Sequence, residues 1–220
     1  MQAISFDVAK LLAGGLVLTS FLMLYQVRLP AVLNVLALHS LILALAVAWQ
    51  AHVQSEPALY ITAAITLIFK AILIPEALRR IVEKLGIHRE IENVTNLGIT
   101  MLAGVGLVAL SLEVMLPVTM HADLLTRTDV ALALSVVLLG LLLMVTRRNA
   151  VSQVAAFLSL ENGIDLAAAG AQDMPMVVEL SIAFSVLVAI LVIGIFLFRI
   201  RERFDSVDMQ ALDAFRGDRR

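Results

Sequence analysis

The sequence predicts an all-α membrane protein that crosses the bilayer about seven times. Apolar residues make up 61% of the 220-residue chain, whereas a soluble domain is usually about 45–50% apolar. Charged residues make up only 15%, and they gather between apolar runs instead of spreading along them. Each apolar run is close to the ~20 residues that a helix needs to cross a hydrocarbon core. Together these observations exclude an ordinary soluble domain.

Seven apolar runs mark the predicted spans. The first follows a start that contains Asp7 and only one Lys, whereas a signal peptide begins with a basic region, so we expect a retained helix. The second opens after Pro30, a residue suited to the first turn of a helix. A polar segment over 79–90 separates the third run from the fourth, and a charged tail over 199–220 closes the chain. The predicted spans are residues 7–27, 31–51, 58–79, 95–118, 128–146, 150–170 and 176–198.

Basic residues predict the orientation, because cytoplasmic loops are enriched in Lys and Arg. They are frequent in every second connection and scarce in the others, with only Arg127 breaking the alternation. This pattern predicts an N-terminus outside and a cytoplasmic C-terminus, which requires an odd number of spans. The basic residues on the predicted cytoplasmic side are Arg28, Arg79, Arg80, Lys84, Arg89, Arg147, Arg148 and those of the tail.

Several classes of chemistry have no support in the sequence. The chain has no Cys, its four His residues are scattered, and it contains no phosphate-binding glycine loop or zinc motif. We therefore expect no metal, no cofactor and no redox centre in this chain. It also has no long soluble loop, so we expect any catalysis to belong to partner subunits, and we expect no nucleic acid to bind.

The most informative stretch is residues 157–165, Phe-Leu-Ser-Leu-Glu-Asn-Gly-Ile-Asp. Glu161 lies near the middle of the sixth predicted span, and Asp165 follows four residues later on the same helix face. An ionisable side chain in lipid is costly and is a functional hypothesis by default. We interpret Glu161 as a proton relay, with interhelical polar bonding as the alternative. For Asp165, a relay and a solvated position near the outer mouth are alternatives.

Four further residues are candidates for the proton relay. Lys70 lies near the middle of the third predicted span, where snorkelling to an interface is awkward, so we expect a buried proton carrier or counter-ion. Glu113 and Glu179 lie nearer the outer surface, where a solvated or helix-capping role is the alternative. His39 lies in the middle of the second span, either as an interhelical hydrogen-bonding group or as a relay near neutral pH.

The last three predicted helices resemble a known family. Arg147-Arg148-Asn149 opens a helix that contains Ser159-Leu160-Glu161-Asn162-Gly163, and the tail contains Asp205-Ser206-Val207. This pattern, over about residues 126–210, resembles the three-helix NuoK subunit of complex I and its relatives in Mrp antiporters. The whole chain, with its Phe69-Lys70-Ala71 segment, looks like the hydrogenase-4 component E (HyfE) group. The resemblance divides the chain into a four-helix region (1–125), a NuoK-like region (126–200) and a cytoplasmic tail (201–220).

The resemblance implies a function and partners. Subunits of this kind lie between antiporter-like membrane subunits and a hydrogenase- or dehydrogenase-type peripheral arm in the bacterial inner membrane. Glu161 then matches the mid-membrane glutamate of the second NuoK helix. The second NuoK glutamate would fall near Phe184 or Ser185, neither of which is acidic, so Asp165, Lys70 or a partner's group would take its place.

The predicted function is therefore that of a non-catalytic membrane subunit of an oxidoreductase complex. It would contribute to translocation of protons or Na⁺ while partner subunits perform the redox reaction. Two alternatives remain open from the sequence. One is a scaffold that bridges redox and antiporter-like subunits without transport, and the other is a subunit of an Mrp-type cation/proton antiporter.

Overall fold

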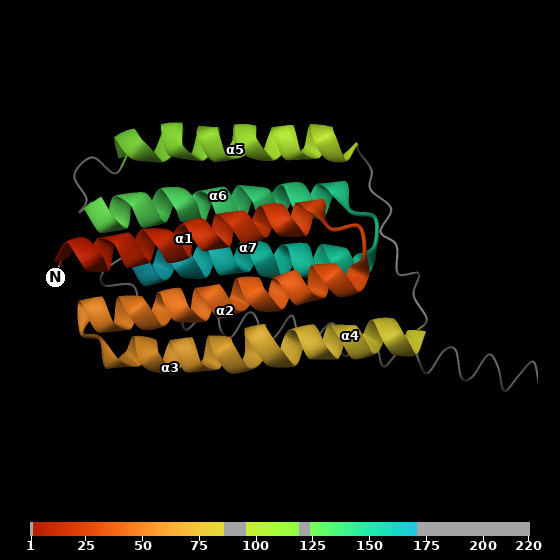
Figure 1. Cartoon of the computed structure of the whole chain (residues 1–220), viewed down its shortest axis with the longest axis horizontal. Coiled ribbons are helices and arrows are strands. Elements are labelled where there is room, and N and C mark those ends of the chain that lie inside the picture. The colour runs from red at the N-terminus through yellow and green to blue at the C-terminus, as the bar shows by residue number, and fades with distance from the viewer. Residues whose placement is uncertain (1, 86–95, 119–123, 171–220) are drawn as a thin grey trace, which may run out of the picture.

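The computed structural model describes residues 2–85, 96–118 and 124–170, and in these ranges the chain forms helices whose successive passes run antiparallel (Figure 1). This confirms the predicted all-α class. The predicted seventh span (176–198) and the tail lie outside the described residues. The elements are α1 (Gln2–Tyr25), α2 (Leu29–Gln54), α3 (Pro57–Ile65), η1 (Thr66–Leu73), α4 (Ile74–Leu85), α5 (Leu97–Val118), α6 (Leu124–Thr146) and α7 (Ala150–Gly170).

The chain is a multi-pass membrane protein. In the part of the chain that the structure describes, five helices are long and apolar enough to cross a membrane. They are α1, α2, the continuous run α3–η1–α4, α5 and α6. The sixth predicted span is α7, with the expected bounds of 150 and 170. It is not one of the five, because it contains the polar stretch around Glu161.

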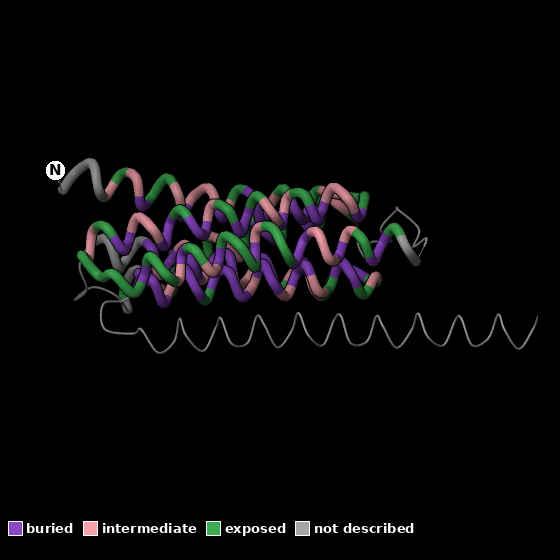
Figure 2. The backbone as a smooth tube through the Cα atoms, turned by 90° about the horizontal axis from the view of Figure 1, so that it is seen from below, coloured by how far each residue is buried: buried purple, intermediate pink, exposed green. Residues whose placement is uncertain are grey.

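Apolar surface distinguishes the outside of this bundle from that of a soluble protein. Figure 2 shows buried residues on the facing sides of the helices and many exposed positions on the outer sides. Large apolar side chains occupy the outer sides, including Leu11, Leu102 and Val145, each about three-quarters exposed. Such a surface is favourable against lipid and costly against water.

Helix α7 lies inside the bundle and organises the packing around it. It packs against α6 on one side and α2 on another, while α1 packs on both α2 and α6 (Figure 1). Helix α5 packs on the outer side of α6, and the run α3–η1–α4 packs on α2. The polar stretch of α7 is therefore enclosed by other helices.

Two glycines allow α6 and α7 to approach closely. A Cβ atom on Gly140 would lie 2.8 Å from backbone atoms of Leu160, and one on Gly163 would lie 2.9 Å from the backbone nitrogen of Val137. Small residues at helix crossings let membrane helices pack backbone to backbone. Because these contacts flank Glu161 and Asn162, they fix the part of α7 that presents the polar side chains.

The third predicted helix differs from expectation in its form. The sequence predicts one α-helix over residues 58–79, whereas the structure shows a continuous run over 57–85 with a π-helix, η1, at its centre. A π-helix has one more residue per hydrogen-bonded turn than an α-helix, and it occurs often at functional sites. Lys70 lies within this segment.

Basic residues gather at the end of the bundle where α1, α4 and α6 finish. Buried Arg147 donates to the carbonyls of Met23 (3.1 Å) and Leu24 (2.8 Å), which close the last turn of α1. Burial lowers the pKa of its guanidinium below the ordinary value, but arginine remains a cation in proteins. Asn149 caps α7, because its Oδ1 accepts the amide of Val151 at 2.9 Å.

The Arg-Arg-Asn motif thus has a structural role at this end. Arg28, Arg79 and Arg80 belong to the connections and helix termini of the same end. Their gathering is what the alternation of basic connections predicts, and the orientation with this end in the cytoplasm stays a prediction.

Candidate functional site

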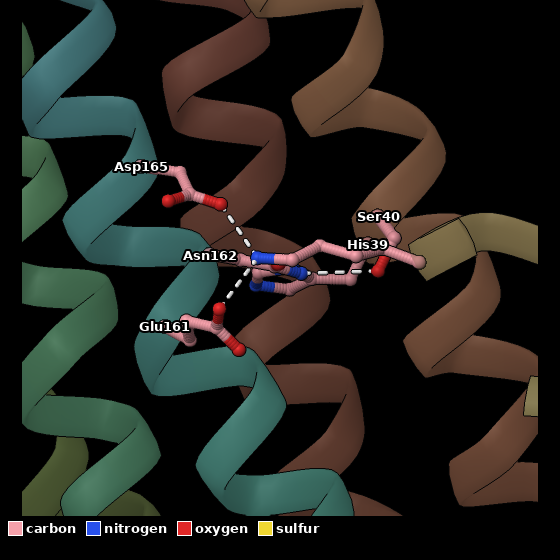
Figure 3. Close-up of polar contacts among 6 residues, drawn as sticks. His39, Ser40, Glu161, Asn162 and Asp165 are labelled. Atoms are coloured by element: carbon pink, nitrogen blue, oxygen red, sulfur yellow. Dashed lines mark hydrogen bonds and ion pairs between the residues drawn. The ribbon is translucent and has the colours of Figure 1, made fainter. Parts of the chain in front are cut away.

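Three charged side chains meet inside the bundle. The Lys70 ammonium on η1 lies 3.3 Å from Oε1 of Glu161 and 2.5 Å from Oδ2 of Asp165, both on α7. In Figure 3 the labelled carboxyl groups of Glu161 and Asp165 point to one nitrogen, which these distances identify as that of Lys70. We call Lys70, Glu161 and Asp165 the charged triad. The spacing of four residues places both acids on one face of α7, as the sequence predicts.

The charged triad is shielded from the surroundings. Lys70, Glu161 and Asp165 are only 4%, 3% and 5% exposed. Removing charges from water costs several kcal/mol per ion even after relaxation, so such groups persist only where they are paired. The helix of Lys70 packs on α2, and its long side chain spans the remaining distance to α7. Lys70 therefore does not snorkel to an interface.

A neutral polar network adjoins the charged triad on α7. His39 on α2 is fully buried, and its Nδ1 lies 3.1 Å from Nδ2 of Asn162, the residue that follows Glu161. Its Nε2 lies 3.1 Å from Oγ of Ser20 and 3.4 Å from Oγ of Ser159. Asn162 also donates to Oγ of Ser40 at 3.1 Å (Figure 3).

The hydrogen bonds fit a neutral His39 whose Nε2 carries the proton. The hydroxyl of Ser20 donates to the carbonyl of Leu16 at 2.9 Å, so its oxygen accepts from His39 Nε2–H. The Asn162 amide donates to Nδ1, which is then unprotonated. His39 is thus a neutral imidazole that joins α1, α2 and α7, which matches the interhelical alternative. Nothing in this geometry requires a relay role for it.

One other predicted relay residue, Glu113, lies apart from the charged triad. Glu113 lies exposed on α5, the helix that packs on the outer side of α6. Its relay role stays a prediction, and a surface role fits its position. Glu179 lies outside the described residues.

Sequence reasoning did not single out several residues of the buried network. Asn162 lies within the polar stretch but had no role of its own, and Ser20, Ser40 and Ser159 are hydroxyls that occur commonly in membrane helices. In the structure Ser20 and Ser159 contact His39, and Ser40 contacts Asn162, each on another helix. The sequence alone does not show these contacts. The described residues also include no group of three or more His, Cys, Asp or Glu that would hold a metal ion.

The arrangement is suited to holding and exchanging protons. It has one amine and two carboxyl groups within contact distance, and a Lys⁺–carboxylate pair can pass a proton within the group without changing its total charge. Oδ1 of Asp165 has no hydrogen-bond partner among the described residues, which leaves an oxygen available to a proton or a water molecule.

Comparison with known proteins gives one informative similarity. No protein-family model matches the sequence, and no solved structure matches it. The chain is 34% identical over 209 residues to a protein of Mycobacterium tuberculosis named "Uncharacterized protein Rv0085". The aligned region covers 93% of this chain and 94% of the mycobacterial protein, so the similarity includes both the four-helix region and the region around Glu161.

Proposed function

The chain belongs to the family of the mycobacterial protein Rv0085, and we propose that it is a proton-carrying membrane subunit of a redox-driven complex. In this proposal the charged triad is a protonatable station inside the bilayer. The observation that supports it is the contact of one buried lysine with two buried carboxyl groups.

The charge balance of the triad explains why it would hold an exchangeable proton. With all three groups ionised, the lysine contributes one positive charge and the acids contribute two negative charges. An uncompensated charge at low dielectric is costly, so the neutral state has one additional proton on the carboxyl groups. The two acids share this proton, and it belongs to the group more than to either residue. A shared proton of this kind can be passed on.

Stability alone does not account for the triad. Replacing a buried ion pair by apolar residues of similar volume is often neutral or stabilising by about 1–4 kcal/mol. Ionisable residues inside membrane segments therefore mark proton or ion pathways more often than structural supports. The π-helix that contains Lys70 also supports a functional role, because such segments occur often at functional sites.

The proposed setting follows the resemblance of the sequence to hydrogenase-4 component E and NuoK-type subunits. The subunit lies in the bacterial inner membrane between antiporter-like subunits and a hydrogenase- or dehydrogenase-type arm. The redox reaction in the arm alters the conformation of the membrane subunits, and the triad takes up and releases protons in response. Transport of Na⁺ instead of protons is an outcome that the experiment below distinguishes.

The first prediction concerns Glu161→Gln in membrane vesicles that contain the assembled complex. The amide keeps the size of the side chain but does not exchange a proton. We expect proton translocation per redox turnover to fall by about 100-fold, within the range that one positioned proton-transfer group contributes. The measurement is pH-indicator fluorescence in the vesicles, with donor oxidation followed in parallel and Na⁺ varied.

Glu76→Gln is the matched control. Glu76 is a surface glutamate on α4 that pairs with Arg79 and Arg80, and exposed pairs contribute little to stability. We expect this variant to translocate protons normally. Normal translocation in both Glu161→Gln and Lys70→Met would contradict the proposal and favour a scaffold.

A further inference from the structure

A third buried acid, Asp129, lies in α6, apart from the charged triad. Asp129 is 2% exposed, and its Oδ2 accepts a hydrogen bond of 2.7 Å from the side-chain amide of Gln50 on α2. Its other oxygen, Oδ1, has no hydrogen-bond partner among the described residues. The sequence places Asp129 at the start of a predicted span, where an acid is usually solvated, and the structure shows instead that it is enclosed.

Three helices build the surroundings of Asp129. Gln54 donates to Oε1 of Gln50 at 3.2 Å and to the carbonyl of Ala169 at 2.8 Å. This holds the Gln50 amide with its N–H groups towards the carboxyl group. Gly170 makes room for the acid, because a Cβ atom there would lie 3.3 Å from that of Asp129.

No cation among the side chains that the structure describes balances a negative charge on Asp129, because none of the ion pairs includes it. The side chains of residues 124–128 lie outside this description. The described charged or titratable groups nearest this end are exposed on α1, α2 and α5 and before α3, or already paired on α7. They are Asp7, Lys10, His52, Glu56, Glu113 and Asp165. A lone buried carboxylate is costly, so the neutral acid is favoured, while the Gln50 N–H stabilises the carboxylate when the proton leaves.

Asp129 lies about one and a half helical turns from the charged triad, measured along α7. Gly170, which contacts it, follows Asp165 by five residues on α7, and at 1.5 Å per residue this is about 7.5 Å along the helix. The buried side chains in this part of the bundle are apolar, and they include Ala133, Leu166 and Ala169. Asp129 lies near the start of α6, and α6 starts at the end of the bundle where the chain starts, opposite the basic end (Figure 1).

We propose that Asp129 is the exit station between the charged triad and the outer surface. Its O–H bond breaks as the proton passes to water at the outer surface, and the resulting carboxylate is held by the Gln50 amide. A proton from the triad, passed through water, then forms the O–H bond again. This inference rests on the proposed function of the triad, and it adds the direction in which protons leave.

The test uses the full-length chain in oriented vesicles. The outer pH is changed rapidly, and the protonation of Asp and Glu carboxyl groups is followed by isotope-edited infrared spectroscopy. In the native chain we expect Asp129 to respond first and the triad after it. In Asp129→Asn we expect the response of the triad to slow by about 100-fold, the contribution of one positioned proton-transfer group.

Two further variants separate a proton station from a structural hydrogen-bonding group. Asp129→Glu keeps a carboxyl group and is expected to restore much of the rate, even if it packs less well. Asp7→Asn removes an exposed acid from the same end and is expected to leave the rate unchanged.

The outcomes distinguish the two proposals. A native response rate of the triad in Asp129→Asn would overturn the inference and leave the proposed function standing, with Asp129 as interhelical bonding only. A triad in the native chain that takes up no proton from either side would instead overturn the proposed function and the relay built on it.

Discussion

Lys70 has a role at the residue scale that its position in the sequence only partly reveals. An isolated lysine among apolar residues predicts a buried functional cation, and the structure confirms that it is buried. Its partners were not predictable, because Lys70 and Asp165 are 95 residues apart in the chain. Only the packing of both η1 and α7 against α2 brings them together.

The second prediction is that Lys70→Met lowers stability increasingly as the pH rises. Without the lysine, Glu161 and Asp165 have no counter-ion in the triad, and ionising them in the folded state becomes costly. Removing one partner of a buried pair costs about 3–5 kcal/mol. We expect the free energy of unfolding of Lys70→Met to fall below that of the native chain by this amount at high pH. At low pH both acids are protonated, so the loss shrinks.

Thermal unfolding in detergent at a series of pH values measures this effect. Lys10→Met is the control, because Lys10 is exposed on α1. A loss of stability that is equal at all pH values would mean that packing, and not charge, is what Lys70 contributes.

Predictability at the element scale differed between the helices. Apolar runs of the right length located the described helices, and the sixth predicted span has the bounds that the structure shows. The π-helix was not predictable, because Thr66–Leu73 is apolar apart from Thr66 and Lys70 and contains no Gly or Pro that would mark a change of helix type. Gly140 was recognisable as a small residue, but its contact with Leu160 depends on how α6 and α7 cross.

The third prediction concerns this crossing. In Gly140→Ala the new Cβ would meet the Leu160 backbone at 2.8 Å, so α6 and α7 must separate. We expect the free energy of unfolding to fall by about 1–3 kcal/mol, the usual cost of overpacking. We also expect slower proton translocation, because Glu161 directly follows Leu160. The measurement is thermal unfolding together with translocation in vesicles.

Gly106→Ala is the control for the crossing. A Cβ atom on Gly106, in α5, would have no neighbour within 4 Å among the described residues. We expect Gly106→Ala not to lower the free energy of unfolding, and a small increase would agree with the higher helix propensity of alanine. Equal effects of the two substitutions would contradict the importance of the crossing.

The whole molecule has two different ends. Arginines gather where α1, α4 and α6 finish, while α1 and α6, the helix that carries Asp129, start at the other end (Figure 1). This separation follows from the alternation of basic and non-basic connections, so the sequence predicts it without knowledge of the packing. The enclosure of Asp129 was not predictable, because it depends on the residues that three helices bring together.

The fourth prediction is that the arginine-rich end faces the cytoplasm. The chain has no Cys, so a single introduced thiol reports its own position, and the parent chain is the blank control. Asp7→Cys and Glu83→Cys place thiols at exposed positions near opposite ends. In intact cells stripped of their outer membrane, we expect a membrane-impermeant maleimide to label Asp7→Cys directly. Glu83→Cys should react only after permeabilisation, and the reverse pattern would contradict the orientation.

The central claim is that the charged triad holds one exchangeable proton beyond that of the lysine. Isotope-edited infrared spectroscopy of the full-length chain at neutral pH tests it by counting protonated carboxyl groups in an Asp129→Asn background. Charge balance predicts one protonated carboxyl group in the intact triad, none in Glu161→Gln or Asp165→Asn, and two in Lys70→Met. Glu76→Gln should leave the count at one. A count that stays the same in all of these variants would contradict the claim.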